Sequence, residues 1–509
     1  RGLKALDQKG GYLMESIWKR TIEEENELIP DKRKSLTGDV HTEAAVIGAG
    51  LAGILTAWVL QSQGVKTVVV EAETAGSGQT QNTTAKITSQ HGVIYHKLLE
   101  TLGREKAAAY ACASQAAVGE YERIIREQAI ACFFEKKPAY LYTREKGEME
   151  EKLLKEAQAA KSLGLPASFT KKPKDPKDLP FSIAGGVRFE EQAQFHPLRF
   201  LHALAKKLVI YEHTRVLEAE EHCLITKQGR IFADHIVFAG HYPFLLRPGY
   251  YFLRMHQERS YCLALKNGII PSAMYLGTDE DGLSLRGFQD MIILGGGKHR
   301  TGENKNGGRY GMLRRKAEEF WPDSREYAHW SAQDCMTLDG VPYIGRFCGD
   351  IPNWYVATGF GKWGMTNSMV AARLISDRIL GREREEGEVF SPQRFTPSAS
   401  AASFITDGVH AARDLGRRVF QKPEISLEEL PAGQGGIVEV DGQKAGAYRD
   451  EDGELYVVSI KCPHLGCQLE WNPDEKSWDC PCHGSRFDYR GRLLDGPAEN
   501  GVDTTEELC

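Results

Sequence analysis

Four cysteines and two histidines are concentrated in two short segments near the C-terminus of the 509-residue chain. Residues 462–467 read CPHLGC and, after 12 further residues, 480–485 read CPCHGS. Together they offer the thiolates and imidazoles of a [2Fe–2S] cluster that has two cysteines on one iron and two histidines on the other. Zn²⁺ is the alternative, but zinc sites usually separate a cysteine pair from a histidine pair. The mixed segments therefore favour the iron–sulfur cluster.

A glycine motif near the N-terminus could bind a dinucleotide. Gly48, Gly50 and Gly53 form GxGxxG between a strand-like apolar stretch and a predicted helix, and a second such stretch ends in Glu71, 18 residues after Gly53. Gly48 permits a tight turn, Gly50 permits close approach of a pyrophosphate, and Gly53 lets the helix pack on the strand. Glu71 could accept hydrogen bonds from ribose hydroxyls, which disfavours NADP. A glycine turn in an ordinary strand–helix unit is the alternative.

A second glycine motif, GFGKWG over residues 359–364, lies between a predicted strand at 354–358 and a predicted helix at 365–380. No acidic residue ends a further strand about 20 residues on, as a second nucleotide site would require. We expect instead that the start of this helix faces an electron-rich part of the same cofactor. In a flavin, that part is N1 and the C2 carbonyl.

The pattern of the remaining elements divides the chain into domains. Strand and helix patterns alternate up to about residue 382, a charged and then Pro-, Ser- and Ala-rich stretch follows, and short strands separated by Gly and Asp begin near 425. We predict an α/β Rossmann-like dinucleotide-binding domain with an interleaved α+β substrate domain, a linker with an amphipathic helix over 404–420, and a small all-β domain. The expected bounds are 41–382 for the first two (nucleotide-binding parts 41–130, 190–240 and 325–382; substrate parts 131–189 and 241–324), 383–425 for the linker and 426–509 for the last.

Composition and charge exclude several classes of protein. The net charge of −6 argues against a nucleic-acid partner, and no apolar stretch predicts a membrane span. The N-terminal residues lack the apolar core of a signal peptide and most cysteines are scattered, so we expect a cytoplasmic protein. The last 84 residues, from Ser426, carry 7 basic and 18 acidic residues, or −11, which leaves +5 for the remainder. Electrostatic docking of the two parts is one interpretation, and solubility is the other.

Residues 41–382 resemble the D-amino-acid-oxidase and glycine-oxidase family of FAD-dependent oxidoreductases. The resemblance is carried by the first glycine motif with Glu71, the loop over 76–86, ADHIVFAG at 233–240, and LDGVPYIG at 338–345 with the glycine turn that follows. It implies FAD bound without a covalent link, because Cys335 does not have the spacing expected for attachment. The cofactor-binding residues that it implies are Gly48, Gly50, Leu51, Ala52, Gly53, Glu71, Ala72, Ser77, Gly78, Thr83, Thr84, Ala85, Lys86, Val216, Ala239, Gly240, Gly359, Gly361, Lys362, Trp363, Gly364, Met365 and Thr366. The adenosine would lie near Glu71 and Val216, and the loop at 77–86 would cross the pyrophosphate and the flavin.

The C-terminal residues 426–509 resemble a Rieske domain of the disulfide-bearing kind found in respiratory cytochrome complexes. The resemblance implies Cys462, His464, Cys480 and His483 as cluster ligands and a disulfide between Cys467 and Cys482. Ser485 matches a serine that donates a hydrogen bond to a bridging sulfide. Phe487 stands where the respiratory pattern has a tyrosine, so we expect a reduction potential below the top of the Rieske range.

Substrate recognition has weaker signals. Arg254 could bind a carboxylate through its planar guanidinium, and His256, Arg259 and Tyr261 lie in the same segment. Lys298 and His299 follow three glycines, where a strand would end near the flavin. We take Arg254, Tyr261, Lys298 and His299 as the catalytic candidates, and solvated charges on a strand are the alternative.

These expectations combine into one function. A small amine or amino-acid-like substrate would give a hydride to FAD, and electrons would then pass one at a time through the Rieske cluster to an external acceptor protein or carrier. Three alternatives are a reductase that runs electrons from a reduced carrier to FAD, a flavoprotein gated by a redox-sensing Rieske module, and a structural protein in which both cofactors are vestigial. The complete ligand sets in both domains argue against the last one.

Overall fold

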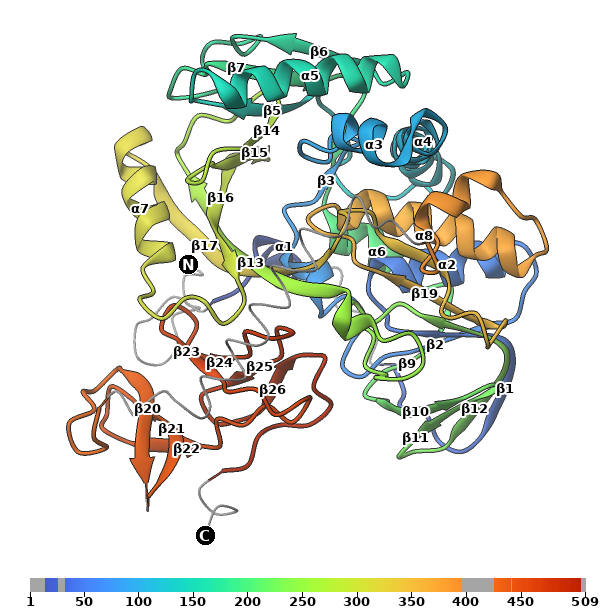
Figure 1. Cartoon of the computed structure of the whole chain (residues 1–509), viewed down its shortest axis with the longest axis vertical. Coiled ribbons are helices and arrows are strands. Elements are labelled where there is room, and N and C mark those ends of the chain that lie inside the picture. The colour runs from blue at the N-terminus through green and yellow to red at the C-terminus, as the bar shows by residue number, and fades with distance from the viewer. Residues whose placement is uncertain (1–13, 26–32, 395–424, 441, 505–509) are drawn as a thin grey trace.

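The computed structural model describes residues 14–25, 33–394, 425–440 and 442–504 of the chain (Figure 1). Within these residues, two eight-stranded sheets and their helices precede a C-terminal part that has a three-stranded and a four-stranded sheet. The amphipathic helix that the sequence predicts over 404–420 lies outside the described residues.

The first sheet brings both glycine motifs to one edge. β12, β1, β2 and β9 are parallel neighbours in this order, β19 is parallel to the end of β12, and the pairs β10–β11, β11–β12 and β18–β19 are antiparallel. Ile47 is opposite Phe238, which is opposite Val356, so the strands end together and the two glycine turns follow at the same edge. The strands are β1 (Val40–Ile47), β2 (Thr67–Val70), β9 (Val209–Tyr211), β10 (Val216–Glu220), β11 (Cys223–Thr226), β12 (Arg230–Phe238), β18 (Tyr343–Arg346) and β19 (Trp354–Thr358).

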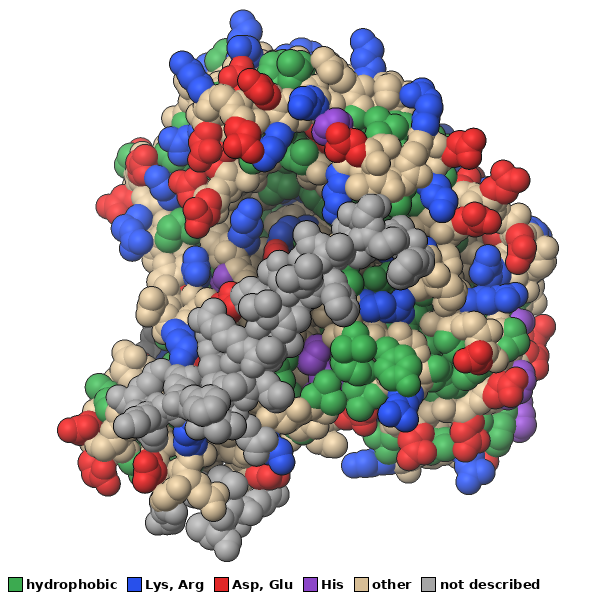
Figure 2. Space-filling model, in the orientation of Figure 1, with side chains coloured by type: hydrophobic (Ala, Val, Ile, Leu, Met, Phe, Trp, Pro, Cys, Tyr) green, Lys and Arg blue, Asp and Glu red, His purple; other side chains and the backbone are tan. Residues whose placement is uncertain are grey.

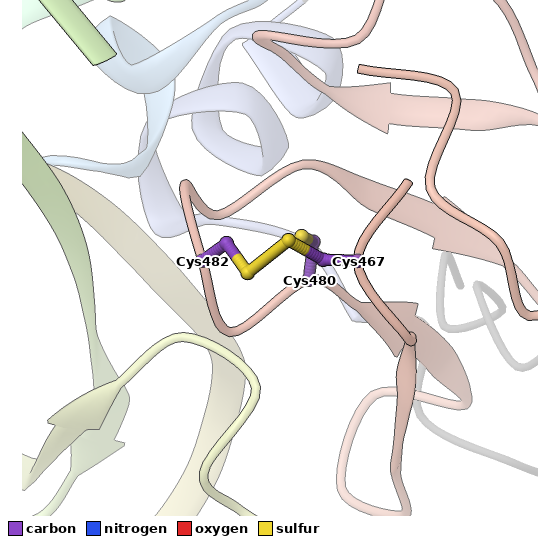
Figure 3. Close-up of side chains that lie close together, drawn as sticks. All are labelled: Cys467, Cys480 and Cys482. Carbon is purple, nitrogen blue, oxygen red and sulfur yellow. A yellow bond between two sulfur atoms is a disulfide. The ribbon is translucent and has the colours of Figure 1, made fainter. Parts of the chain in front are cut away.

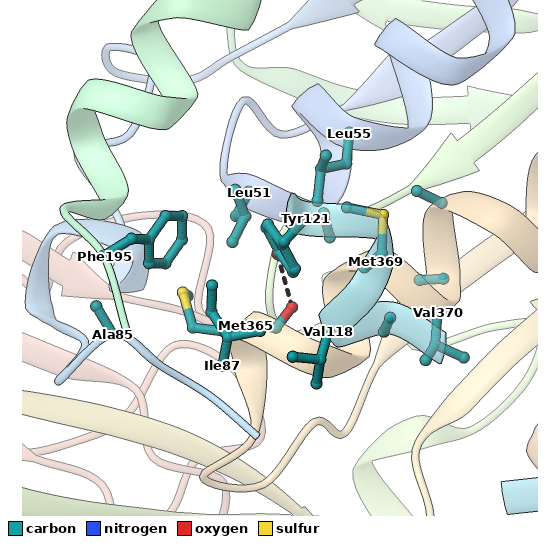
Figure 4. Packing of buried hydrophobic residues seen from close by; sticks show 14 of the residues in the cluster. Leu51, Leu55, Ala85, Ile87, Val118, Tyr121, Phe195, Met365, Met369 and Val370 are labelled. Carbon is teal, nitrogen blue, oxygen red and sulfur yellow. Dashed lines mark hydrogen bonds between the residues drawn. The ribbon is translucent and has the colours of Figure 1, made fainter. Parts of the chain in front are cut away.

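Helices pack together beside this sheet and form the main apolar core. Leu51 and Met369 contribute to a cluster with residues of other helices, and Tyr121 donates a hydrogen bond of 2.7 Å to the Met365 carbonyl (Figure 4). Burying one such large side chain stabilises the fold by about 1.5–3 kcal/mol. The helices are α1 (Ile17–Glu25), α2 (Leu51–Ser62), α3 (Tyr95–Leu102), α4 (Arg104–Glu127), α6 (Pro197–Ala205) and α8 (Gly364–Ile379), with the 3₁₀ helices η1 (Gln79–Asn82), η2 (Tyr251–Leu253) and η3 (Glu385–Phe390).

The second sheet has the strand order β17-β13-β16-β15-β14-β5-β7-β6, and its long strands run through the middle of the molecule (Figure 1). Two helices, α5 (Glu148–Ser162) and α7 (Arg309–Phe320), pack against it. Its strands are β5 (Ala139–Thr143), β6 (Ala167–Thr170), β7 (Gly185–Phe189), β13 (Met255–Lys266), β14 (Met274–Gly277), β15 (Ser284–Phe288), β16 (Met291–Arg300) and β17 (Arg325–Thr337). A small sheet of β3 (Lys86–Ile87), β8 (Ala193–Gln194) and β4 (Glu135–Lys136) lies between the two.

Two elements of the second sheet differ from the expectation. Residues 325–337 are assigned to the nucleotide-binding part by the sequence pattern, but they form β17, which pairs along its length with β13 of the second sheet. The strand at 291–294 does not end at Gly295, because its pairing with β13 extends it to Arg300. In both cases the long antiparallel partner β13 decides the length and the position of the strand.

The C-terminal part contains only strands, turns and loops among its described residues. The first sheet consists of β20 (Gly435–Val440), β21 (Gln443–Arg449) and β22 (Leu455–Val458), and the second of β23 (Glu470–Asn472), β24 (Ser477–Asp479), β25 (Arg486–Asp488) and β26 (Leu493–Asp495). Trp478 and Phe487 are completely buried in its core. None of the helices within the described residues combines the length and the apolar character needed to cross a bilayer.

Candidate functional site

A cavity of about 1020 Å³ lies where the glycine edge of the first sheet, the second sheet and the C-terminal part meet. Cavities of this size exceed the usual range for small ligands and have room for an elongated cofactor together with a substrate. All of the cofactor-binding residues expected from the sequence line it except Gly53, Ala85 and Thr366. On the face shown in Figure 2, both acidic and basic side chains of the described residues lie beside the hollow.

The glycine edge fits the dinucleotide. Gly48 has φ +100°, and a Cβ atom there would lie 2.8 Å from the Ala239 carbonyl oxygen. A Cβ on Gly53 would lie 1.9 Å from the Gly48 carbonyl oxygen, which explains why this glycine is needed for packing although it does not line the cavity. The Glu71 carboxylate accepts hydrogen bonds from the backbone N–H groups of Ala49 (2.7 Å) and Glu73 (2.9 Å). Each oxygen can accept a second bond, as recognition of ribose hydroxyls requires.

Two lysines line the cavity in opposite electrostatic settings. The Lys86 ammonium donates to the Ser284 hydroxyl, and among the described residues no carboxylate pairs with it. Burial, with a smaller contribution from the charge of Arg286, lowers the pKa of Lys86 to about 7. Burial also works to lower the pKa of Lys362, but two carboxylates lie 3.2–3.3 Å from its Nζ atom and together they raise it. Those carboxylates belong to Glu258 and Asp334.

The structure separates the four catalytic candidates. Tyr261 and Lys298 are among the described residues that line the cavity, whereas Arg254 and His299 are not. Arg254 donates to the carbonyls of Gly249 (2.9 Å) and Pro392 (2.7 Å), so its guanidinium is already occupied elsewhere. The expectation that Arg254 binds a substrate carboxylate in this cavity is therefore wrong.

His299 takes part in the site indirectly. Its Nδ1 donates to the Arg300 carbonyl at 2.7 Å, which leaves Nε2 to accept from the Tyr261 hydroxyl at 3.0 Å. Burial raises the pKa of Tyr261, and the hydroxyl also lies 3.4 Å from the Nδ2 of Asn472 in the C-terminal part. Lys298 lies at the rim of the cavity: it is among the lining residues but is exposed, and β16 continues past it to Arg300.

Other residues near the site have a structural role. His256 lies 3.8 Å from the Glu258 carboxylate and does not line the cavity. Arg259 does line it, but its guanidinium bonds to Glu475 of the C-terminal part and to Gln333 at 2.9 Å. Sequence reasoning missed this pairing, because no local pattern indicates a partner 216 residues away.

The two cysteine–histidine segments meet in one buried site. Cys467 and Cys482 form a disulfide, and the Cys480 sulfur lies within 4.8 Å of both their sulfurs (Figure 3). The disulfide removes two of the three sulfurs as ligands, which leaves Cys480 with Cys462 from the other segment. The rings of His464 and His483 lie 4.8 Å apart, and the Nδ1 atom of each is buried without a hydrogen-bond partner.

This donor set fits a [2Fe–2S] cluster. Two free thiols and two buried, unpartnered imidazole nitrogens are what mixed cysteine and histidine ligation uses. Ser485 lies beside the cluster ligands, because its hydroxyl bonds to the Cys462 sulfur. The completely buried Phe487 offers no hydroxyl.

Comparison with known proteins agrees with both sites. A model of the FAD dependent oxidoreductase family (DAO) matches residues 43–378, and a model of the Rieske [2Fe-2S] domain matches residues 422–506. A protein of Bacillus subtilis (strain 168), described as a Rieske 2Fe-2S iron-sulfur protein and called YhfW, is 37% identical over 481 residues, which cover 91% of this chain and 93% of the relative. The cytochrome b6-f complex iron-sulfur subunit of Synechococcus elongatus is 32% identical over 106 residues, which are 20% of this chain and 57% of that protein.

Solved structures support the same fold. Glycine oxidase from Geobacillus kaustophilus has a TM-score of 0.59 at 18% identity and covers 70% of this chain and 99% of its own. L-proline dehydrogenase from P. horikoshii has a TM-score of 0.58 at 17% identity, with 71% and 99% covered. The chain therefore belongs to the FAD-dependent oxidoreductase family of the D-amino-acid-oxidase type and carries a C-terminal Rieske [2Fe–2S] domain, so that its cofactors are FAD and a [2Fe–2S] cluster.

Proposed function

We propose that this protein is a dehydrogenase that oxidises a small amine or amino-acid-like substrate and passes the electrons through its own Rieske cluster to an external one-electron acceptor. When bound, the flavin accepts a hydride and the cluster carries one electron at a time. The observation that carries the proposal is the direct contact between the wall of the flavin cavity and the loop that holds the cluster ligands.

Two glutamines make this contact. Gln333 of β17 lines the cavity, and its Nε2 donates to the Gly484 carbonyl at 2.8 Å. The same amide donates to Oε1 of Gln257 at 2.7 Å, and Nε2 of Gln257 donates to the His483 carbonyl at 2.7 Å. The cluster loop therefore rests on the cavity wall, and this position supports electron transfer without a large movement of the Rieske domain.

The substrate class is supported by the second-sheet end of the cavity. Tyr140, Met274 and Tyr275 line the cavity there, and Lys86 supplies a buried ammonium group that bonds to Ser284 on the neighbouring strand β15. This combination suits a small substrate with one anionic group, and Lys86 takes the carboxylate-binding role first expected for Arg254. Glycine oxidase and L-proline dehydrogenase, which share the fold, are named for amino-acid substrates.

The direction of electron flow can be tested with the full-length holoprotein. It is mixed without oxygen with a panel of small amines and amino acids, and low-temperature EPR follows the cluster while absorbance follows the flavin. A Rieske EPR signal that appears with one substrate supports the proposal, and dithionite provides the positive control. Bleaching of the flavin without this signal contradicts the relay and favours the gating alternative, whereas flavin reduction by a reduced carrier alone favours the reductase.

A variant at the contact sharpens the test. Gln257→Leu removes the hydrogen bond to the His483 carbonyl, and Gln257 itself does not line the cavity. We expect cluster reduction by the substrate to lag behind flavin bleaching in this variant. Arg314→Met serves as the control, because this arginine pairs with Glu326 and, among the described residues, neither lines the cavity nor makes a hydrogen bond to the cluster loop, and we expect no lag.

The compartment is also a proposal. The six cysteines outside the Rieske domain that the structure describes are free thiols, which supports the expected cytoplasmic location.

A further inference from the structure

A segment of the Rieske domain forms part of the wall of the flavin cavity. Residues 494–499, at the end of β26 and in the loop that follows, all line the cavity, together with Glu475 and Arg486 of the same domain. This contribution is independent of the substrate and of the direction of electron flow.

The segment is attached to the loop expected to cross the FAD pyrophosphate. Oδ1 of Asp495 accepts a hydrogen bond of 2.8 Å from Nε2 of Gln79, and Oδ2 accepts one of 2.9 Å from Nη1 of Arg486. The Gln79 side chain is fixed at its other end as well, because its Oε1 accepts from the backbone N–H of Gln333 at 2.8 Å. Gln79 and Asp495 therefore join the two domains directly over the glycine edge.

The far end of the segment reaches the position expected for the adenosine. Burial raises the pKa of the Glu499 carboxylate, and the positive charge of Arg215 opposes this rise. The two side chains are therefore near enough to interact. Arg215 lines the cavity next to Val216, which the family resemblance places at the adenosine. Residues 494–499 thus extend from the pyrophosphate end to the adenosine end of the cleft.

The same segment touches the cluster site. The backbone N–H of Ala498 donates to the Ser485 hydroxyl oxygen at 3.0 Å, and the Ser485 hydroxyl bonds to the sulfur of the ligand Cys462. One short stretch of chain therefore contacts the environments of both cofactors.

We propose that residues 494–499 of the Rieske domain are part of the FAD-binding site and cover the bound cofactor between its pyrophosphate and its adenosine. FAD is then retained by the docked Rieske domain. By thermodynamic linkage, FAD binding stabilises the docking of that domain by the same factor.

The test measures FAD release, without substrate, from the full-length holoprotein. Release into an excess of an apo-flavoprotein that binds FAD is followed by flavin fluorescence for the wild type, Asp495→Ala and Glu499→Ala. We expect release to be about tenfold faster in Asp495→Ala, the factor that corresponds to the loss of about 1.4 kcal/mol. A smaller increase is expected for Glu499→Ala, whose carboxylate is less enclosed.

The matched control is Asp474→Ala, which also breaks contacts between the domains. Asp474 accepts from the N–H groups of Gly308 and Arg309 but does not line the cavity, so its loss can act on FAD only through weaker docking, and we expect a clearly smaller acceleration than in Asp495→Ala. Unchanged release in both test variants overturns the proposal, and so does equal acceleration in all three. The Rieske EPR signal after dithionite reduction confirms an intact cluster; if Asp495→Ala loses it, Glu499→Ala alone decides.

Discussion

Arg259→Met should loosen the docking of the Rieske domain on the flavin domain. Arg259 on β13 and Glu475 of the Rieske domain form an ion pair in which each side chain is only 2% exposed. Arg486, also of the Rieske domain, bonds to the same Glu475 oxygen. The arginine from the flavin domain is therefore one of two cations that neutralise a buried carboxylate at the interface.

The expected size follows from this arrangement. Removing one partner of a buried ion pair costs about 3–5 kcal/mol, because the remaining charge cannot be rehydrated. Glu475 keeps its bond to Arg486 and so is not left without a cation, although Arg486 also pairs with Asp479 at 3.0 Å and Asp495 at 2.9 Å. We therefore expect the lower end of the range, about 3 kcal/mol, which is roughly a 150-fold change in the docking equilibrium.

Hydrogen exchange measures this equilibrium at two defined amides. The backbone N–H groups of Gly308 and Arg309, at the start of α7, donate to the Asp474 carboxylate of the Rieske domain at 3.1 and 2.9 Å. They exchange when the domains separate, so mass spectrometry of the peptide that contains them reports undocking. We expect exchange roughly 150-fold faster in Arg259→Met at the same pH.

Two further variants separate docking from a general loss of stability. Arg259→Lys keeps the charge without the planar guanidinium, so we expect partial recovery of protection. Glu475→Gln combined with Arg259→Met should cost less than the sum of the two single changes, because the two groups interact directly. Unchanged exchange of Gly308 and Arg309 in Arg259→Met, or strictly additive effects in the double variant, would refute the reasoning.

Three other predictions concern the two cofactor sites. Because the pKa of Lys86 is lowered to about 7, its ammonium is lost as the pH rises through 7, and a small carboxylate inhibitor should bind more weakly above that pH. The inhibitor dissociation constant is measured from the change in flavin absorbance at each pH between 6 and 9. It should rise with pH in the wild type and stay constant in Lys86→Met, and an equal slope in both would contradict the prediction. Phe487→Tyr should raise the cluster reduction potential, because an added donor stabilises the reduced form, and an EPR-monitored redox titration that finds no rise would count against this. Replacing both Cys467 and Cys482 with alanine removes a cross-link between residues that are 15 positions apart in the sequence. The unfolded chain then gains conformational freedom, so the cluster-binding loops should be destabilised by about 3 kcal/mol. The denaturant midpoint for loss of the cluster absorbance checks this, with an unchanged midpoint as the contrary result.

The sequence predicted the local parts of both sites well. Gly48 and Gly53 are needed because a Cβ atom at either position would collide with backbone. Every turn from a strand to a helix that binds a pyrophosphate has the same requirement, so the glycine spacing can be recognised in the sequence. The cysteine and histidine segments are similarly local, since each holds its ligands within a few residues. The Cys467–Cys482 disulfide, implied by the resemblance, is present in the structure.

Expectations about single charged side chains were less successful. Arg254 looks like a carboxylate ligand in the sequence, but in the fold the carbonyls of Gly249 and Pro392 occupy its guanidinium. Lys298 does line the cavity, as expected, but it is exposed, and the strand that carries it is extended to Arg300 by pairing with β13. The direction in which a strand residue points depends on the register and length of its neighbours, which the pattern within one strand does not contain.

The sequence by itself determined the two cofactors and the order of the domains, and it predicted the residues that would hold each group, because backbone turns and ligand sets are short-range requirements written within one or two segments. The tertiary structure alone decided how the two domains meet. The pairing of Arg259 with Glu475 spans 216 residues, and that of Gln79 with Asp495 spans 416. Such contacts depend on which faces two folded domains bury against each other, and no periodicity or spacing along the chain specifies that choice.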